Sequence, residues 1–152
     1  MMLVIGSDHG GLELKSVLIE TLHQRGIDVR DLGTDNGDSV DYPDFAEKVA
    51  SAVSHGEAAC GVLICGTGIG MSIVANKFPG VRAALVTDEY MARMAKEHNN
   101  ANILVLGGRV LDALAAGRMV GIWLDATYEA GRHQRRLDKI STIEADVRAG
   151  RI

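Results

Sequence analysis

The stretch Cys65–Gly70, with the sequence CGTGIG, places a cysteine and alternating glycines directly after the apolar residues GVLI. The spacing G-x-G-x-G differs from the dinucleotide-binding fingerprint, and Met71 stands where a Walker loop needs a lysine. What remains is a run of backbone N–H groups that leads into a helix N-terminus, which favours an anion or a thiolate. Cys65 is therefore a candidate nucleophile or general base, with Thr67 placed to donate a hydrogen bond to it. A glycine-rich turn without any ligand is the alternative.

Asp8 and His9 follow the first apolar run and form a second candidate group. An aspartate at the start of a helix is also a good N-cap, so Asp8 has a purely structural interpretation as well. His98, in the sequence EHNN, precedes the fifth apolar run. An isolated histidine in a loop usually has no chemical role, but its ordinary pKa suits proton transfer near neutral pH.

Arginines near the C-terminus form a third group. Arg132 and Arg136 are four residues apart, so in a helix they share one face and are able to clamp a phosphate. The alternative is a solvated basic face. Arg109, directly after the fifth apolar run, is a further candidate cation.

The two cysteines are not expected to form a disulfide. Cys60 and Cys65 lie in one apolar run, where an extended chain separates them by about 16 Å, far beyond disulfide reach. Cys60 is interpreted as a small core residue. Without a disulfide framework or an export signal, we expect a reducing cytoplasm. The five histidines are scattered along the chain without metal-binding spacing, so we expect neither a metal nor a cofactor.

Composition limits the class of protein. The 152 residues suit one domain, 1–152, and 47% of them are hydrophobic, which allows a substantial core. The net charge of −4 gives no reason to expect nucleic acid or an anionic membrane as a partner. No apolar run is long enough to span a bilayer.

Apolar runs alternate with amphipathic segments, which predicts an α/β fold with a five-stranded parallel sheet. Strands are expected over 2–8, 28–33, 60–65, 81–88 and 102–108, and helices over 11–25, 43–55, 69–78, 89–97, 109–122 and 128–148. In such folds ligands bind beyond the carboxyl ends of the strands, where Asp8, Cys65 and Arg109 are expected. The last helix has no strand after it, and we expect its apolar stripe to pack on a partner subunit.

Five motifs in order give a resemblance to a known family: SDHGGLELK, SVDYPDFA, LICGTGIGMSIVANK, EHNNANILVLGGRV and GRHQRRLDKI. Together they resemble the ribose-5-phosphate isomerase B family, from Met2 to about Ile143. That family also includes galactose- and allose-6-phosphate isomerases. The resemblance implies a Rossmann-like three-layer sandwich, a homodimer or homotetramer with active sites shared between subunits, and aldose–ketose isomerisation through a cis-enediolate.

The resemblance also implies residue roles. Cys65 is the base, because the following GMSIVAN lacks the glutamate that other members use. Asp8 handles substrate hydroxyls, and His98 assists ring opening, with Thr67 and Asn99 nearby. The remaining implied substrate-binding residues are His9, Arg132 and Arg136 for the phosphate, Arg109 reaching in from the partner, Tyr42 facing the sugar, and the turn Gly66, Gly68, Ile69 and Gly70 for the developing oxyanion.

Two other functions stay open. The substrate could be a hexose 6-phosphate, because pocket depth depends on loops that the sequence does not position. A non-catalytic sugar-phosphate or nucleotide-binding module is the alternative from another class. It would use the glycine turn, but it would not need Cys65, Asp8 and His98 together.

Overall fold

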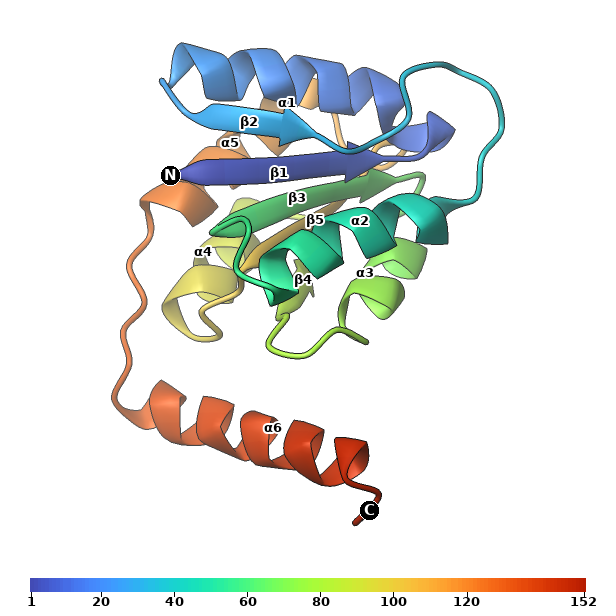
Figure 1. Cartoon of the computed structure of the whole chain (residues 1–152). Helices are drawn as coiled ribbons and strands as arrows, with labels where there is room; N and C mark the ends of the chain where they lie inside the picture. The colour runs from blue at the N-terminus through green and yellow to red at the C-terminus, as the bar shows by residue number, and fades with distance from the viewer.

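The computed structural model, which describes residues 1–152, contains one sheet of five parallel strands in the order β2-β1-β3-β5-β4 (Figure 1). The strands are β1 Met2–Ser7, β2 Asp28–Asp31, β3 Cys60–Cys65, β4 Ala83–Leu85 and β5 Ile103–Gly107. All neighbouring pairs are parallel, which confirms the predicted α/β sheet. The edge strands β2 and β4 are shorter than predicted, and short edge strands are common because they expose few unpaired backbone groups.

Helices cover both faces of the sheet. The helices of the chain are α1 Leu12–Gln24, α2 Tyr42–Ser54, α3 Ile69–Ala75, α4 Glu89–Glu97, α5 Ala113–Asp125 and α6 Arg132–Arg148, with a short 3₁₀ turn η1 at His9–Gly11. The first five cover the sheet. One core lies between the sheet and α1, α4 and α5, and the other between the sheet and α2 and α3 (Figure 1). Because strand side chains alternate, Cys60 joins the first core and Cys65 the second.

Cys60 is a structural residue, as expected. It is buried, it is a free thiol, and burial raises its pKa. A thiol held in its neutral form is a weak nucleophile.

Two helices begin later than predicted, and both differences have local causes. Helix α5 was expected from 109, but Asp112 caps it by accepting the Ala115 N–H at 2.8 Å, so it starts at Ala113. Helix α6 was expected from 128, but Ala130 and Gly131 both have φ of +53°, which is outside the helical region. Helix α3 ends at Ala75 rather than at 78.

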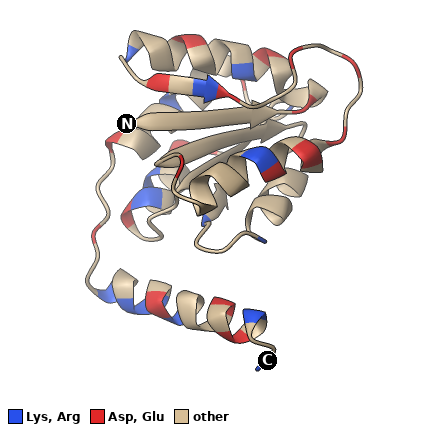
Figure 2. Cartoon of the chain, viewed as in Figure 1, with Lys and Arg blue, Asp and Glu red and all other residues tan.

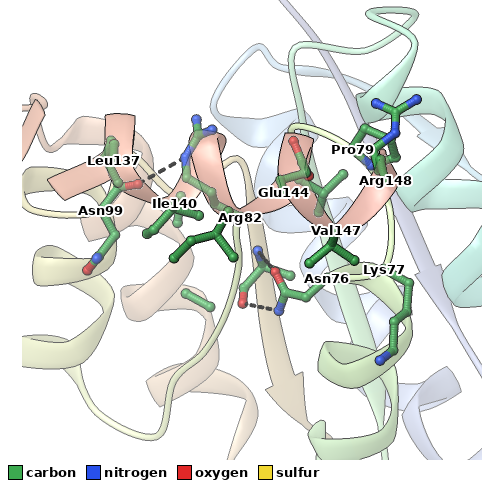
Figure 3. Close-up of a pocket in the computed structure, with 15 residues that line it drawn as sticks. Asn76, Lys77, Pro79, Arg82, Asn99, Leu137, Ile140, Glu144, Val147 and Arg148 are labelled. Atoms are coloured by element: carbon green, nitrogen blue, oxygen red, sulfur yellow. Dashed lines mark hydrogen bonds between the residues drawn. The ribbon is translucent and has the colours of Figure 1, made fainter. Parts of the chain in front are cut away.

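Helix α6 follows an extended linker and lies outside the two cores (Figure 1). Leu137 is buried, and the Glu144 carboxylate accepts the Gly80 N–H at 3.0 Å. Three apolar side chains on this helix are exposed: Ile140, Ile143 and Val147. They line a groove of about 590 Å³ between α6 and the segment 76–84 (Figure 3). No helix is both long and apolar enough to cross a membrane.

Candidate active site

The carboxyl ends of β1, β3 and β5 meet at one edge of the sheet. The register pairs Ser7 with Ile64 and Cys65 with Gly107, so the residues that follow these strands lie side by side. The Gly108 N–H, for example, donates to the Cys65 carbonyl at 2.8 Å. The carboxyl-edge cluster comprises the predicted site residues gathered here: Asp8, His9, Tyr42, Cys65, Gly66, Thr67, Gly68, Ile69, Gly70 and Arg109.

Cys65 is enclosed by the glycine turn. Its side chain is buried, and its Sγ accepts the Gly68 N–H at 3.2 Å. Gly68 has φ of +82°, and a Cβ added there would lie 2.5 Å from the Leu85 side chain. Only glycine meets both conditions, so the turn is able to direct a backbone N–H at the sulfur. A hydrogen bond of this kind is stronger to a charged acceptor than to a neutral one, which suits a cysteine that works as a base.

The prediction that Thr67 donates a hydrogen bond to Cys65 is wrong. Thr67 is exposed, and its Oγ1 accepts the Ile69 N–H at 3.3 Å. The N–H groups of Gly68 and Ile69 are therefore already engaged by side chains of the turn itself. Three N–H groups of the turn make no hydrogen bond within the chain and are free for a substrate oxygen: those of Gly66, Thr67 and Gly70.

Asp8 and His9 end β1 next to this turn. Asp8 is buried and is the N-cap of the 3₁₀ turn, because its Oδ1 accepts the Gly11 N–H at 3.1 Å. The structural interpretation of Asp8 is thus confirmed, and the cap also aims its carboxyl group at the sheet edge. The Nδ1 atom of His9 accepts the Val40 N–H at 3.2 Å. A ring nitrogen that accepts carries no proton, so neutral His9 has its proton on Nε2.

Tyr42 and Arg109 complete the carboxyl-edge cluster. The Tyr42 ring lies over the start of α3, where a Cβ added to Gly70 would be 2.6 Å from it. Arg109 lies beside the turn, since a Cβ added to Gly66 would be 3.2 Å from its Nη1. Within one chain the Arg109 guanidinium thus already lies beside the turn that carries Cys65, and the expectation that Arg109 also reaches into a partner's site stays a prediction. Arg109 is exposed and forms no ion pair.

The remaining predicted residues form a separate group at the other edge of the sheet. His98 is the C-cap of α4, which returns from the carboxyl edge, and β5 begins only at Ile103. Arg132 and Arg136 lie in the first turns of α6, where positive charge is concentrated (Figure 2). We call His98, Asn99, Arg132 and Arg136 the amino-edge cluster. One chain therefore does not bring these residues to Cys65.

His133 is a residue of the amino edge that the sequence-based reasoning missed. It is buried, and its ring stacks on His98 with centroids 4.1 Å apart and an interplanar angle of 14°. The Glu129 Oε2 lies 3.4 Å from His133 Nε2 and 3.9 Å from His98 Nε2. The only signal in the sequence was the position of His133 between Arg132 and Arg136, which indicated a residue of a basic helix face.

The two histidines and Glu129 correct the view that the histidines are scattered, because their ligand atoms lie within 4.8 Å of one another. Imidazole binds a metal through a lone pair in the ring plane. In two nearly parallel rings these lone pairs do not converge on one point, so the geometry suits a stacked pair better than a shared ion. The absence of a metal from the site stays a prediction.

The free energy of unfolding is expected to fall as the pH drops below about 6.5, the ordinary pKa of histidine. Burial lowers the pKa of His133, and His98, Arg132 and Arg136 lower it further, against an opposing effect of Glu129. Between the folded and unfolded pKa values the folded state binds fewer protons, so stability is lost as the pH falls through that window. Urea denaturation at several pH values should show that His133→Phe loses less unfolding free energy at low pH than the wild type does. His23→Gln, on the exposed face of α1, is the control, and equal pH slopes for wild type and His133→Phe would contradict the assignment.

Comparison with known proteins gives a consistent result. The model of the ribose/galactose isomerase family matches residues 3–140. Ribose-5-phosphate isomerase B of Escherichia coli is 45% identical over 142 residues, which cover 93% of this chain and 95% of that protein.

Solved structures agree over nearly the whole chain. Ribose-5-phosphate isomerase B of Clostridium thermocellum superposes with a TM-score of 0.95 at 53% identity, covering 97% of this chain and 99% of that one. The enzyme of Mycoplasma genitalium, solved with bound ribulose-5-phosphate, gives 0.92 at 44% identity, covering 95% and 97%.

Proposed function

The chain belongs to the ribose/galactose isomerase family, and from this we infer that it is an aldose–ketose isomerase that interconverts ribose 5-phosphate and ribulose 5-phosphate. The observation that carries this conclusion is the near full-length match to ribose-5-phosphate isomerase B enzymes, one of them with ribulose-5-phosphate bound. The carboxyl-edge cluster supplies the matching chemistry: a cysteine, a carboxylate and free backbone donors at the ligand-binding edge of the sheet. We further propose that residues 1–152 act as one isomerase domain in the cytoplasm.

In the proposed mechanism Cys65 is the general base. The thiolate removes the C2 proton of the open-chain aldose, the electrons shift toward O1, and the cis-enediolate takes up a proton at C1. The free N–H groups of Gly66, Thr67 and Gly70 are the donors available to the developing oxyanion. In comparable sites the loss of one such donor costs about 3 kcal/mol of barrier. Asp8 exchanges protons with the substrate hydroxyls.

Phosphate binding is proposed to involve both edges. His9 presents Nε2–H to the phosphate, because its Nδ1 is occupied by the Val40 N–H. Arg132 and Arg136 supply the charge, and Arg109, which lies beside the turn, is a further substrate-binding cation. Tyr42 packs on the turn and closes the sugar pocket. Binding energy at the phosphate then orients the sugar over Cys65.

We propose that each active site is shared between two copies of the chain. Ring opening by His98 with Asn99 and proton abstraction by Cys65 act on the same sugar, yet these residues lie at opposite edges of one chain. A second copy is needed to bring its amino-edge cluster to the first copy's carboxyl edge. The exposed Ile140, Ile143 and Val147 of α6 support a homodimer or a homotetramer, because an apolar face of this kind is usually covered.

The activity is tested by incubating the chelator-treated protein with ribose 5-phosphate in deuterated water. We expect ribulose 5-phosphate with solvent deuterium at C1, and isomerisation that does not depend on added metal. Allose 6-phosphate and galactose 6-phosphate run in parallel identify a hexose preference. Binding of the sugar phosphates without deuterium exchange would instead indicate the non-catalytic module.

A further inference from the structure

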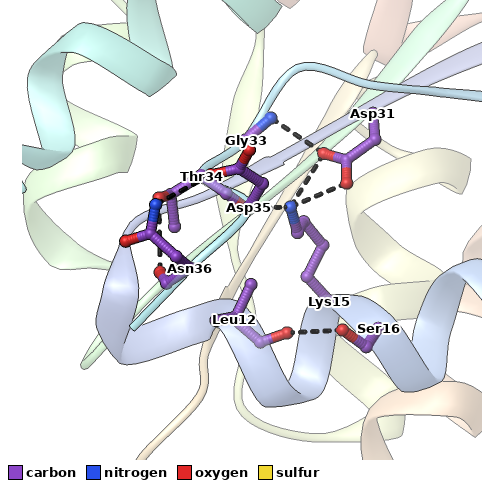
Figure 4. A network of polar contacts seen from close by, with 8 residues as sticks. All are labelled: Leu12, Lys15, Ser16, Asp31, Gly33, Thr34, Asp35 and Asn36. Carbon is purple, nitrogen blue, oxygen red and sulfur yellow. Dashed lines mark hydrogen bonds and ion pairs between the residues drawn. The ribbon is translucent and has the colours of Figure 1, made fainter. Parts of the chain in front are cut away.

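Lys15 is a charged residue in the interior of the protein. It lies on α1, and its side chain is only 2% exposed. Its Nζ is 2.9 Å from Asp31 Oδ1, 2.7 Å from Asp31 Oδ2 and 2.5 Å from the Thr34 carbonyl (Figure 4). Lysines are almost never buried unless they are paired, so these contacts account for its presence. All of them belong to one segment, the end of β2 and the residues after it.

The segment after β2 passes very close to the end of β1. The Leu32 N–H donates to the Ile5 carbonyl at 2.8 Å, and the Thr34 N–H donates to the Ser7 carbonyl at 3.0 Å. A Cβ added to Gly33 would lie 2.5 Å from the Ser7 nitrogen and 2.9 Å from Lys15 Nζ. Lys15 and the backbone of β1 thus both hold the chain where it leaves β2 and enters the loop 35–41.

The far end of this loop contacts the candidate site. The loop runs outward from β2 and returns to the start of α2 (Figure 1). Just before α2 the Val40 N–H donates to His9 Nδ1, and Tyr42 follows with its ring on Gly70. His9 itself is six residues before Lys15, on the turn that leads into α1. Lys15 thus links two parts of the chain. One is the segment that carries His9, and the other is the loop that orients the His9 ring.

We propose that Lys15 is a positioning residue for the phosphate-binding half of the site. By holding Asp31 and Thr34 it keeps the loop 35–41 in place, and through the Val40 N–H the loop keeps the His9 proton on Nε2, which faces the substrate. The proposal rests on the inferred phosphate role of His9. A charged anchor suits this task, because three donors satisfied by three acceptors specify one loop conformation.

The test is Lys15→Met, which keeps the length and the apolar body of the side chain. The protein should still fold, because the abandoned Asp31 carboxylate is 40% exposed and also accepts the Gly33 N–H at 2.8 Å. We expect the ¹⁵N resonances of the His9 imidazole, assigned with His9→Asn, to change from one Nε2–H tautomer to an exchange average. KM for ribose 5-phosphate should rise about tenfold, with kcat within about twofold of wild type. Lys48→Met, on the exposed face of α2, is the matched control.

An unchanged His9 tautomer together with an unchanged KM in Lys15→Met would overturn the proposal, whatever the melting temperature. If that variant does not fold, the same two measurements are made on Asp31→Asn. That change weakens the contact between Lys15 and Asp31 from its exposed partner. The histidine resonances are independent of catalysis. A wild-type protein that fails to isomerise ribose 5-phosphate but whose His9 tautomer still depends on Lys15 would reject the proposed function and leave standing only the control of the His9 ring by Lys15.

Discussion

Replacing Cys65 by serine is expected to lower kcat for ribose 5-phosphate isomerisation by about 10²- to 10⁴-fold, the usual contribution of a general base. Serine is nearly as large as cysteine, and its Oγ is able to accept the Gly68 N–H that now bonds the sulfur. The turn should therefore survive while the ionisable group is lost, because a serine hydroxyl does not ionise near neutral pH. Cys65→Ala should be equally inactive, but it also leaves that N–H without its acceptor.

Deuterium incorporation at C1 of the product provides the measurement, because it reports proton transfer directly. Cys60→Ala is the matched control: Cys60 ends up in the other core, five residues away along the same strand, and its loss should leave kcat unchanged. Near wild-type exchange in Cys65→Ser would show that another group is the base. Asp8, the carboxylate of the carboxyl-edge cluster, would then be the first candidate to examine.

Two inactive variants are expected to restore activity when they are co-expressed. Cys65→Ser disables the carboxyl edge and His98→Asn disables the amino edge. In a two-fold symmetric dimer with shared sites, half of the dimers are mixed, and each mixed dimer has one site with both residues intact. Activity should therefore reach about a quarter of the wild-type value.

The control pair is Cys65→Ser with Asp8→Ala, because both changes lie in the carboxyl-edge cluster. Every site of every dimer then carries one of the two lesions, and no activity should return. Restoration by both pairs, or by neither, in a protein that sedimentation shows to be dimeric would contradict a site shared between copies. Each copy would then have to supply the whole catalytic set itself.

Much of the fold could be predicted because its signals are local. The alternation of apolar strands and amphipathic helices depends on the types of consecutive residues, and it predicts the parallel sheet. Positions at the carboxyl ends of β1, β3 and β5 follow in turn, so the meeting of Asp8, Cys65 and Arg109 was foreseeable. The errors were local as well: Asp112 is an N-cap that the sequence displayed, and it was overlooked at the start of α5.

Contacts between distant segments could not be predicted in this way. The stacking of His98 on His133 depends on the linker before α6, in which Ala130 adopts a left-handed conformation that its side chain disfavours. The contact of Lys15 with Asp31 and Thr34 depends on how closely the chain passes over β1. Neither spacing has a periodic signature, since each results from packing between elements far apart in the sequence.

The sequence by itself determined the order of the elements, the edge of the sheet where the carboxyl-edge cluster gathers, and the cysteine at that edge, because each depends on residue types at short range. The tertiary structure decided which candidates meet. It tied His9 to Lys15 through the loop after β2, and it left His98, Arg132 and Arg136 at the opposite edge. The physical reason is that such contacts depend on packing between segments far apart in the sequence, as for α6 and its linker. No local pattern of residue types predicts that packing.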